Sequence, residues 1–213
     1  MEKKKNRVRK LEEKLETGEL TPKEAQRILQ EQGLTHREDW KDFIWYIAWA
    51  ILCFLPGIAK SANPEILSPL VQLPTLKFPT AAVYSSTILL VSAICIEAYV
   101  FHWRVSRGGL GSEDDTVVLI KEGPYRIVRH PSTVDWTIGF ITITIAISDY
   151  APFTVLSILG NTALIICHYK GTLAEEELNL KKWGDEYEQY MKEVPRFNFI
   201  RGLWNLRKEE TGT

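Results

Sequence analysis

The sequence is poor in the patterns that mark redox and metal-binding proteins. It has three cysteines, and each lies in or beside an apolar run: Cys53, Cys95 and Cys167. No two of them are spaced as metal ligands or as a redox pair, so we expect free thiols, with palmitoylation of Cys167 as the alternative. The four histidines show no H-x-x-H or H-x-x-x-H spacing, which excludes the di-iron membrane hydroxylases and predicts no metal site.

An excess of one charge and an apolar N-terminal segment are also missing. The formal net charge is -1, which gives no reason to expect a nucleic-acid partner. The basic stretch MEKKKNRVRK at the start is not followed by an apolar run, so we expect no cleavable secretory signal. These absences leave the distribution of apolar and charged residues along the chain as the main guide to its fold.

Long apolar runs alternate with charged segments. Charged residues make up 25% of the chain, but they are concentrated at both ends and in one middle stretch. Because a bilayer is spanned by about 20 helical residues, the apolar runs predict four transmembrane helices, at about 42–59, 79–101, 134–148 and 151–169. Pro56 should kink the first helix or end it early. Almost no loop separates the last two, which predicts a tight helical hairpin whose helices pack together.

The positive charges support this number of spans. Lys and Arg residues number eleven in 1–41, two in 60–78, five in 102–133, none in 149–150 and eight in 170–213. Basic residues favour the cytoplasmic side of a membrane, so we predict a multi-pass integral membrane protein with both termini in the cytoplasm. The proline-rich segment 61–78 is expected to be an irregular outer loop with a short interfacial helix.

The N-terminal segment forms a separate region in this prediction. Residues 1–33 read as a polar helical hairpin in which Gly18 ends the first helix and Thr21 and Glu24 form a capping box at the start of the second. We therefore divide the chain into a cytoplasmic hairpin, 1–41, and a membrane domain, 42–213. The favoured interpretation is that the hairpin packs on the inner face of the protein itself. The alternative is a module for homo-oligomerisation or for binding the membrane surface.

Two polar clusters flank the predicted hairpin of spans. The first is KEGPYRIVRHP, residues 121–131, and the second lies in 175–196, within an amphipathic helix predicted at 172–192. One cluster precedes the hairpin and the other follows it, so both should lie at the cytoplasmic surface, close together in space. Arg129 is a costly charge at a membrane edge unless it has a partner. Carboxylates of the second cluster are the expected partners.

The order of residues in these clusters is specific. GPYRIVRHP, a hairpin of spans, and then EEELNLKKWGDEYEQYMKEVPR resemble the isoprenylcysteine carboxyl methyltransferase family, over about residues 117–197. That family belongs to a wider group of membrane methyltransferases that includes the phospholipid methyltransferases. The resemblance implies an all-α membrane fold in which cytoplasmic amphipathic helices close a site for S-adenosylmethionine. The absence of a G-x-G-x-x-G motif agrees with a site that is not built on a Rossmann sheet.

The resemblance also implies roles for individual residues. Those expected to contact the cofactor are Leu119, Ile120, Tyr125, His130, Glu176 and Tyr187. A carboxylate and aromatic faces suit the positively charged sulfur of this cofactor. Arg129 and Glu176 are the expected catalytic residues. The side chains expected at the acceptor are Arg129, Asp135, Glu97 and Arg196.

The nature of the acceptor decides what chemistry is needed. A prenylcysteine-like carboxylate is already nucleophilic, and Arg129 could hold it through two hydrogen bonds. A phospholipid or small-lipid amine must lose a proton, and Glu176 or His130 would then act as the base. In either case the partner is a membrane lipid or a lipidated molecule.

Three positions depart from the family pattern. Thr133 stands where the family commonly has a tyrosine, Asp135 places a carboxylate at the entrance of a span, and the segment after VPR, Phe197-Asn198-Phe199, lacks the usual following proline. A carboxylate inside a span, such as Glu97, is a functional candidate or half of an internal ion pair. The departures leave open a non-catalytic protein that uses this fold for binding or assembly.

Overall fold

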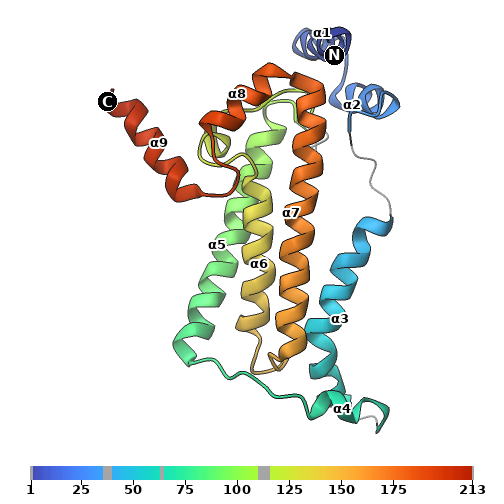
Figure 1. Ribbon diagram of the computed structural model, residues 1–213, viewed down its shortest axis with the longest axis vertical. Coiled ribbons are helices and arrows are strands. Elements are labelled where there is room, and N and C mark those ends of the chain that lie inside the picture. Colours follow the sequence, from blue (N-terminus) through green and yellow to red (C-terminus); the bar gives the residue numbers. More distant parts are fainter. Residues whose placement is uncertain (1, 36–39, 63–64, 110–115, 213) are drawn as a thin grey trace. The chain divides into compact units, whose positions relative to one another are not determined.

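The computed structural model describes residues 2–35, 40–62, 65–109 and 116–212 (Figure 1). Within these ranges the chain forms nine α-helices and no strand, so the all-helical class is confirmed. The chain divides into two compact units. One contains Met1–Arg37, Glu97–Val134 and Gly171–Thr213, and the other contains Glu38–Ile96 and Asp135–Lys170. We call them the polar unit and the apolar unit. The boundary between them falls within helices α5, α6 and α7.

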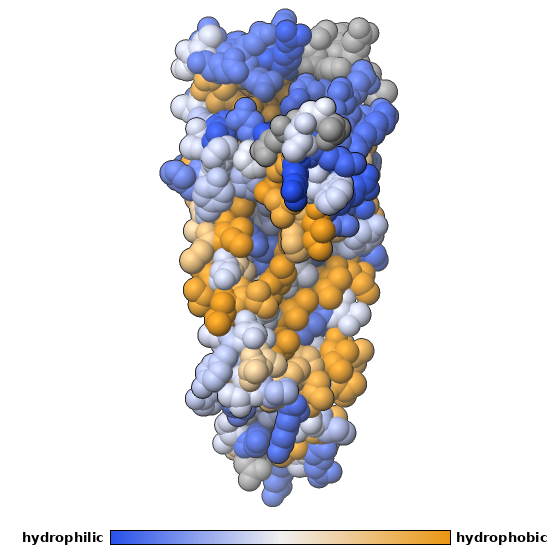
Figure 2. Space-filling view, turned by 90° about the vertical axis from the view of Figure 1, so that its left-hand side faces the viewer, coloured by the Kyte–Doolittle hydropathy of each residue, from blue (hydrophilic) through white to orange (hydrophobic). Residues whose placement is uncertain are grey.

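Two helices are long and apolar enough to cross a membrane. They are α3 (Trp40–Ala62), over Phe43–Ala62, and α5 (Thr80–Val105), over its full length. A core helix of a soluble protein is mostly buried, but only 28% of the α3 window and 11% of the α5 window is buried. Large apolar side chains therefore lie on the surface, as Figure 2 shows for one face. The most exposed on these helices include Ile47, Ile51, Ile58, Tyr84, Ile88 and Ile94.

Helices of the apolar unit are joined by paired polar side chains. The Trp49 indole on α3 donates to Oδ1 of Asn161 at 3.0 Å, and the amide nitrogen of Asn161 donates to the Thr144 hydroxyl at 3.2 Å. Asn161 lies on α7 (Val155–Trp183) and Thr144 on α6 (Pro131–Ala146). Inside a membrane such groups must find protein partners because water is absent. These contacts confirm that the helices of the predicted hairpin pack together.

The structure corrects two predicted boundaries. Helix α3 contains Pro56 and continues to Ala62, so of the two predicted effects of Pro56 the early end of the helix is wrong, and the kink stays a prediction. Neighbouring helices can satisfy the backbone groups that a proline leaves unpaired. The predicted amphipathic helix 172–192 is not a single helix. Its first part completes α7, and Gly184, with φ of +56°, separates it from α8 (Asp185–Glu193).

The predicted outer loop contains short helices, Glu65–Leu67 in a 3₁₀ turn and α4 (Ser68–Val71), in agreement with its irregular character. Helices α6 and α7 lie where the third and fourth spans were expected. Crossing of the membrane by these two helices stays a prediction, and so does the division of the chain at residue 41.

In the polar unit, the N-terminal hairpin has the predicted form. Helix α1 spans Glu2–Glu16 and α2 spans Pro22–Glu31, with both hydrogen bonds of the Thr21–Glu24 capping box present. The hairpin shares one apolar core with the ends of α7 and α8: Val8, Leu11, Ala25, Leu29, Leu34, Val117, Trp183, Tyr187 and Tyr190. The interpretation that the hairpin packs on its own chain is therefore confirmed. Homo-oligomerisation through it stays a prediction.

Candidate functional site

A tight turn begins the first polar cluster. Gly123 has φ of +59° and opens a short 3₁₀ helix, Gly123–Arg126. A Cβ atom at this position would collide with the indole ring of Trp103 on α5, so both the backbone conformation and the space require glycine. The turn places the Tyr125 carbonyl where the Tyr190 hydroxyl donates to it at 2.7 Å.

The two clusters meet, as their predicted topology implied. The Arg129 backbone N–H donates to the carbonyl of Pro195 at 3.0 Å, so the first cluster is joined to the end of the second by main chain as well as by side chains. All of these residues belong to the polar unit. The distances between these residues are therefore distances within one compact unit.

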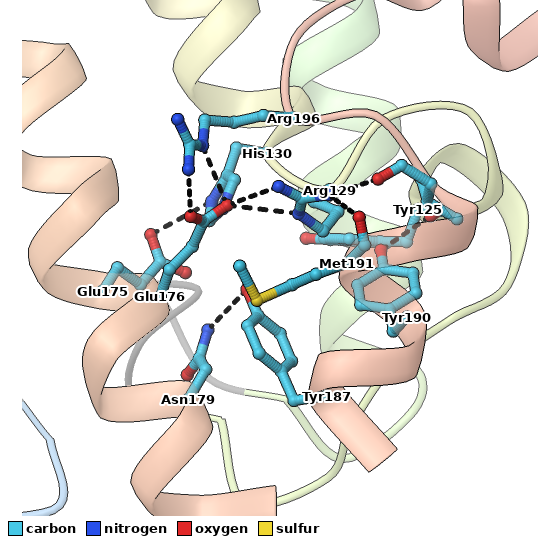
Figure 3. A network of polar contacts seen from close by, with 11 residues as sticks. Tyr125, Arg129, His130, Glu175, Glu176, Asn179, Tyr187, Tyr190, Met191 and Arg196 are labelled. Carbon is cyan, nitrogen blue, oxygen red and sulfur yellow. Dashed lines mark hydrogen bonds and ion pairs between the residues drawn. The ribbon is translucent and has the colours of Figure 1, made fainter. Parts of the chain in front are cut away.

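Glu176 is the centre of a buried network (Figure 3). Its Oε1 accepts from Nε and Nη2 of Arg129, at 3.1 and 2.8 Å, and from Nε of Arg196 at 2.9 Å. Its Oε2 accepts from Nη2 of Arg196 at 2.5 Å. Only 3% of Glu176 is exposed. Burying a charge is costly unless it is paired and hydrogen-bonded, and here one carboxylate is shared by two guanidinium groups.

Arg129 is fully engaged within the protein. Besides Glu176, its Nη1 donates to the carbonyl oxygen of Met191 at 2.7 Å and to that of Val194. The side chain thus ties α7 to the C-terminal end of α8. These contacts give Arg129 a positioning role, and its predicted role in holding an acceptor stays a prediction.

His130 lies between two carboxylates. Its Nε2 is 3.3 Å from Oε1 of Glu176, and its Nδ1 is 3.3 Å from Oε2 of Glu175. The side chain is 1% exposed. A protonated imidazole can donate to both carboxylates, whereas a neutral ring donates from only one nitrogen. The histidine therefore lies between two adjacent acidic side chains of α7, and its protonated form can donate to both.

The network sets the charge state of Glu176. Burial alone would raise the pKa of this carboxyl, but hydrogen bonds from His130, Arg196 and Arg129, together with the Arg129 charge, hold its pKa well below the usual range. Glu176 is therefore ionised at neutral pH, and its oxygens are occupied. A group in this state is a poor general base.

A pocket adjoins the network. It has about 350 Å³ of empty space, a figure that includes open solvent. Its lining residues are Arg104, Thr116, Val118, Leu119, Ile120, Tyr125, Arg129, Glu175, Asn179, Trp183, Tyr187 and Tyr190. The pocket combines aliphatic and aromatic walls with charges of both signs. Burial raises the pKa of Tyr187 to about 12, so its hydroxyl stays neutral.

The predicted cofactor residues, together with Arg129 and Arg196 of the predicted acceptor residues, fall into two groups. Leu119, Ile120, Tyr125 and Tyr187 line the pocket, as does Arg129. The second group belongs to the network behind this lining: His130, Glu176 and Arg196.

The other two predicted acceptor residues are not among the described residues that line the pocket. Glu97 is a half-buried residue of α5. Asp135 is a buried residue of the apolar unit. Their contribution to an acceptor site stays a prediction.

Several lining residues were not predicted from the sequence. The clearest are Glu175, Asn179 and Trp183, which follow one another at intervals of four residues on α7. Residues four apart lie on the same face of a helix. This spacing is visible in the sequence, and it marks the face of α7 that borders the pocket.

Compared with known proteins, the chain matches no family model, no curated protein and no solved structure.

Proposed function

We propose that this protein is an S-adenosylmethionine-dependent methyltransferase that acts on a membrane-embedded acceptor. The observation that carries the proposal is the pocket of the polar unit. It is lined by residues from the clusters around Tyr125 and Tyr187, which the sequence motifs single out. The same chain contains two helices apolar enough to cross a membrane, α3 and α5.

The lining residues suit the chemical groups of this cofactor. When bound, S-adenosylmethionine supplies a methyl group attached to a positively charged sulfur. Glu175 and the rings of Tyr125 and Tyr187 provide the negative charge and aromatic faces that stabilise a cation. Arg104, only 3% exposed, is a buried cation in the same lining and suits a carboxylate. The aliphatic side chains of 118–120 suit a flat heterocycle.

The network favours an acceptor that needs no base. Glu176 is ionised and saturated with hydrogen bonds, so it does not readily take a proton from an amine. A carboxylate acceptor, as in a prenylcysteine, needs no deprotonation. Arg196 is the arginine better placed to meet it, because its side chain is 26% exposed whereas that of Arg129 is 6% exposed.

Catalysis in this proposal rests on positioning. Methyl transfer is an in-line displacement, so the protein must hold the acceptor and the methyl group in line and exclude water. The Arg129–Glu176–Arg196 network rigidifies the wall of the pocket for this purpose. The proposed topology has four spans with both termini in the cytoplasm, and an acceptor that reaches the pocket from the bilayer.

Transfer of a labelled methyl group tests this proposal. Detergent-purified protein is given S-adenosylmethionine labelled in its methyl group, with either a farnesylated cysteine bearing a free carboxylate or phosphatidylethanolamine. We expect label on the farnesylcysteine. Label on the lipid amine would show that the protein methylates amines and not carboxylates. No transfer to either, by a folded protein that also fails to bind the cofactor, would favour a non-catalytic binding or assembly role.

A further inference from the structure

Two buried polar atoms in the pocket lining have no hydrogen-bond partner among the residues that the structure describes. They are Oδ1 of Asn179 and Nε1 of Trp183, on side chains that are 5% and 6% exposed. Buried polar groups are almost always hydrogen-bonded, and the exceptions call for an explanation. One atom is an acceptor and the other is a donor. A ligand that satisfies both must present a donor and an acceptor.

The Asn179 amide is held in place from its other end. Its nitrogen donates to the Tyr187 hydroxyl at 3.4 Å, as Figure 3 shows. Rotating the amide by half a turn would exchange the roles of its two ends but would still leave one end unpaired. The unsatisfied atom is therefore a property of the site and not of the assignment of nitrogen and oxygen.

The position of these residues along α7 indicates which part of a ligand they meet. Glu175, Asn179 and Trp183 lie on one face at intervals of four residues, so about 12 Å of helix separates the first from the last. The charged residue lies at one end of this row, and the amide and the indole lie toward the other. A matching ligand is elongated, with a cationic group at the Glu175 end and a flat, polar-edged ring at the Trp183 end.

We propose that Asn179 and Trp183 recognise the adenine ring of the cofactor, an inference that rests on the proposed methyltransferase function. Oδ1 of Asn179 accepts a hydrogen bond from the exocyclic amine, and the Trp183 indole N–H donates to a ring nitrogen. Amide side chains suit the adenine edge because that edge offers a donor beside an acceptor. These two residues would make the pocket specific for an adenine nucleoside.

The test uses calorimetric titration of the full-length, detergent-purified protein with two ligands. One is S-adenosylhomocysteine, and the other is its purine analogue, which lacks the exocyclic amine but keeps the ring nitrogens. We expect the wild-type protein to bind S-adenosylhomocysteine at least about tenfold more tightly than the purine analogue, since the analogue leaves Asn179 unpaired. Asn179→Leu should abolish this preference. Trp183→Phe should lower the affinity for both ligands by a similar factor, about fivefold or more, and keep the preference for the adenine ligand.

A matched control separates recognition from structural support. Tyr187→Phe removes the hydroxyl that holds the Asn179 amide but leaves Oδ1 in place, so this variant should keep the preference for adenine. Thermal unfolding shows whether each variant is folded. Titrating the wild-type protein with both ligands tests the preference for adenine without any variant.

The outcomes that contradict the inference are distinct. If the wild-type protein binds both ligands equally, or if Asn179→Leu keeps the preference, adenine is not recognised by Asn179. If Tyr187→Phe loses the preference as fully as Asn179→Leu, Asn179 only supports Tyr187. If the folded wild-type protein binds neither ligand, the proposed function and this inference are both wrong.

Discussion

Two buried asparagines on α7 show how the two units differ. Asn161, in the apolar unit, is 7% exposed, and both ends of its amide are paired, with Trp49 and Thr144. Asn179, in the polar unit, is 5% exposed and lines a pocket, and its Oδ1 has no hydrogen-bond partner within the described part of the chain. A buried amide with both ends paired holds helices together. One that keeps an unsatisfied atom beside a pocket is suited to a ligand.

The same contrast applies to charge. The polar pairs that we describe in the apolar unit are formed by neutral groups, which suits helices in a membrane. In the polar unit, Glu176 joins Arg129 and Arg196 in a network that depends on full charges. Removing one member of such a network leaves the others buried without compensation. The largest effects of mutation should therefore be found there.

Glu176→Gln should cause the largest change. It removes the carboxylate that two arginine side chains share, and we expect the free energy of unfolding to fall by about 3–5 kcal/mol. Chemical unfolding in detergent, followed by circular dichroism, measures this loss. Glu177→Gln is the matched control, because Glu177 is exposed and pairs with Lys181 on the same helix. Equal stability of the two variants would show that the network does not support the fold.

Asn161→Leu and Asn179→Leu should separate structure from binding. We expect Asn161→Leu to lower the free energy of unfolding by about 1–3 kcal/mol, because the buried Trp49 N–H loses its acceptor, with no change in ligand affinity. Asn179→Leu should cost less stability, since it also removes an unpaired oxygen, but should alter ligand preference. Unfolding and titration of both variants test the contrast. The reverse pattern would show that the two asparagines have been assigned the wrong roles.

Acid should weaken the polar unit through Glu176. Because its folded-state pKa lies below the ordinary value of 4.5, this carboxyl contributes stability that is present above about pH 4.5 and is lost as the pH falls toward the folded-state pKa. Unfolding measured between pH 7 and pH 3 should show this loss. The loss should be smaller in Glu176→Gln, which has no carboxyl to protonate. An identical pH profile for both proteins would argue that another group controls the response.

Glu12→Gln should give the smallest effect, with the opposite sign. Burial, followed by the charges of Glu186 and Glu16, raises the pKa of Glu12 on α1. A raised folded-state pKa means that its stabilising contribution is present at low pH and is lost as the pH rises through that pKa. Replacing the carboxyl by a neutral amide should therefore raise the Tm slightly at pH 7. A lower Tm at pH 7 would mean that the attraction of Glu12 to Arg9 and Lys121 outweighs the burial and repulsion.

Part of the fold and of the candidate site could be predicted from the sequence. The meeting of Arg129 with a carboxylate of the second cluster followed from the order of apolar runs, and the Thr21 capping box followed from residue types three apart. Which of three consecutive glutamates binds Arg129 could not be predicted. Successive helical residues point about 100° apart, so the rotation of α7 selects Glu176, and that rotation depends on packing along the whole helix.

The break at Gly184 was also missed. The apolar residues on either side keep a helical spacing, so the pattern continues across Gly184 although the backbone does not. The pocket-facing row on α7 has a visible spacing of four. It could be recognised only once Glu175 was known to face the pocket, because Trp183 alone fits an apolar core equally well.

The most direct test of the central claim is calorimetric binding of S-adenosylmethionine to the detergent-purified protein, with two neighbouring acidic residues compared. Glu175 lines the pocket, whereas Glu177 is an exposed residue two positions away on the same helix. We predict binding in the micromolar range that is lost or strongly weakened in Glu175→Gln and kept in Glu177→Gln. Absence of binding by the folded wild-type protein, or equal binding by both variants, would contradict the claim that this pocket holds the cofactor.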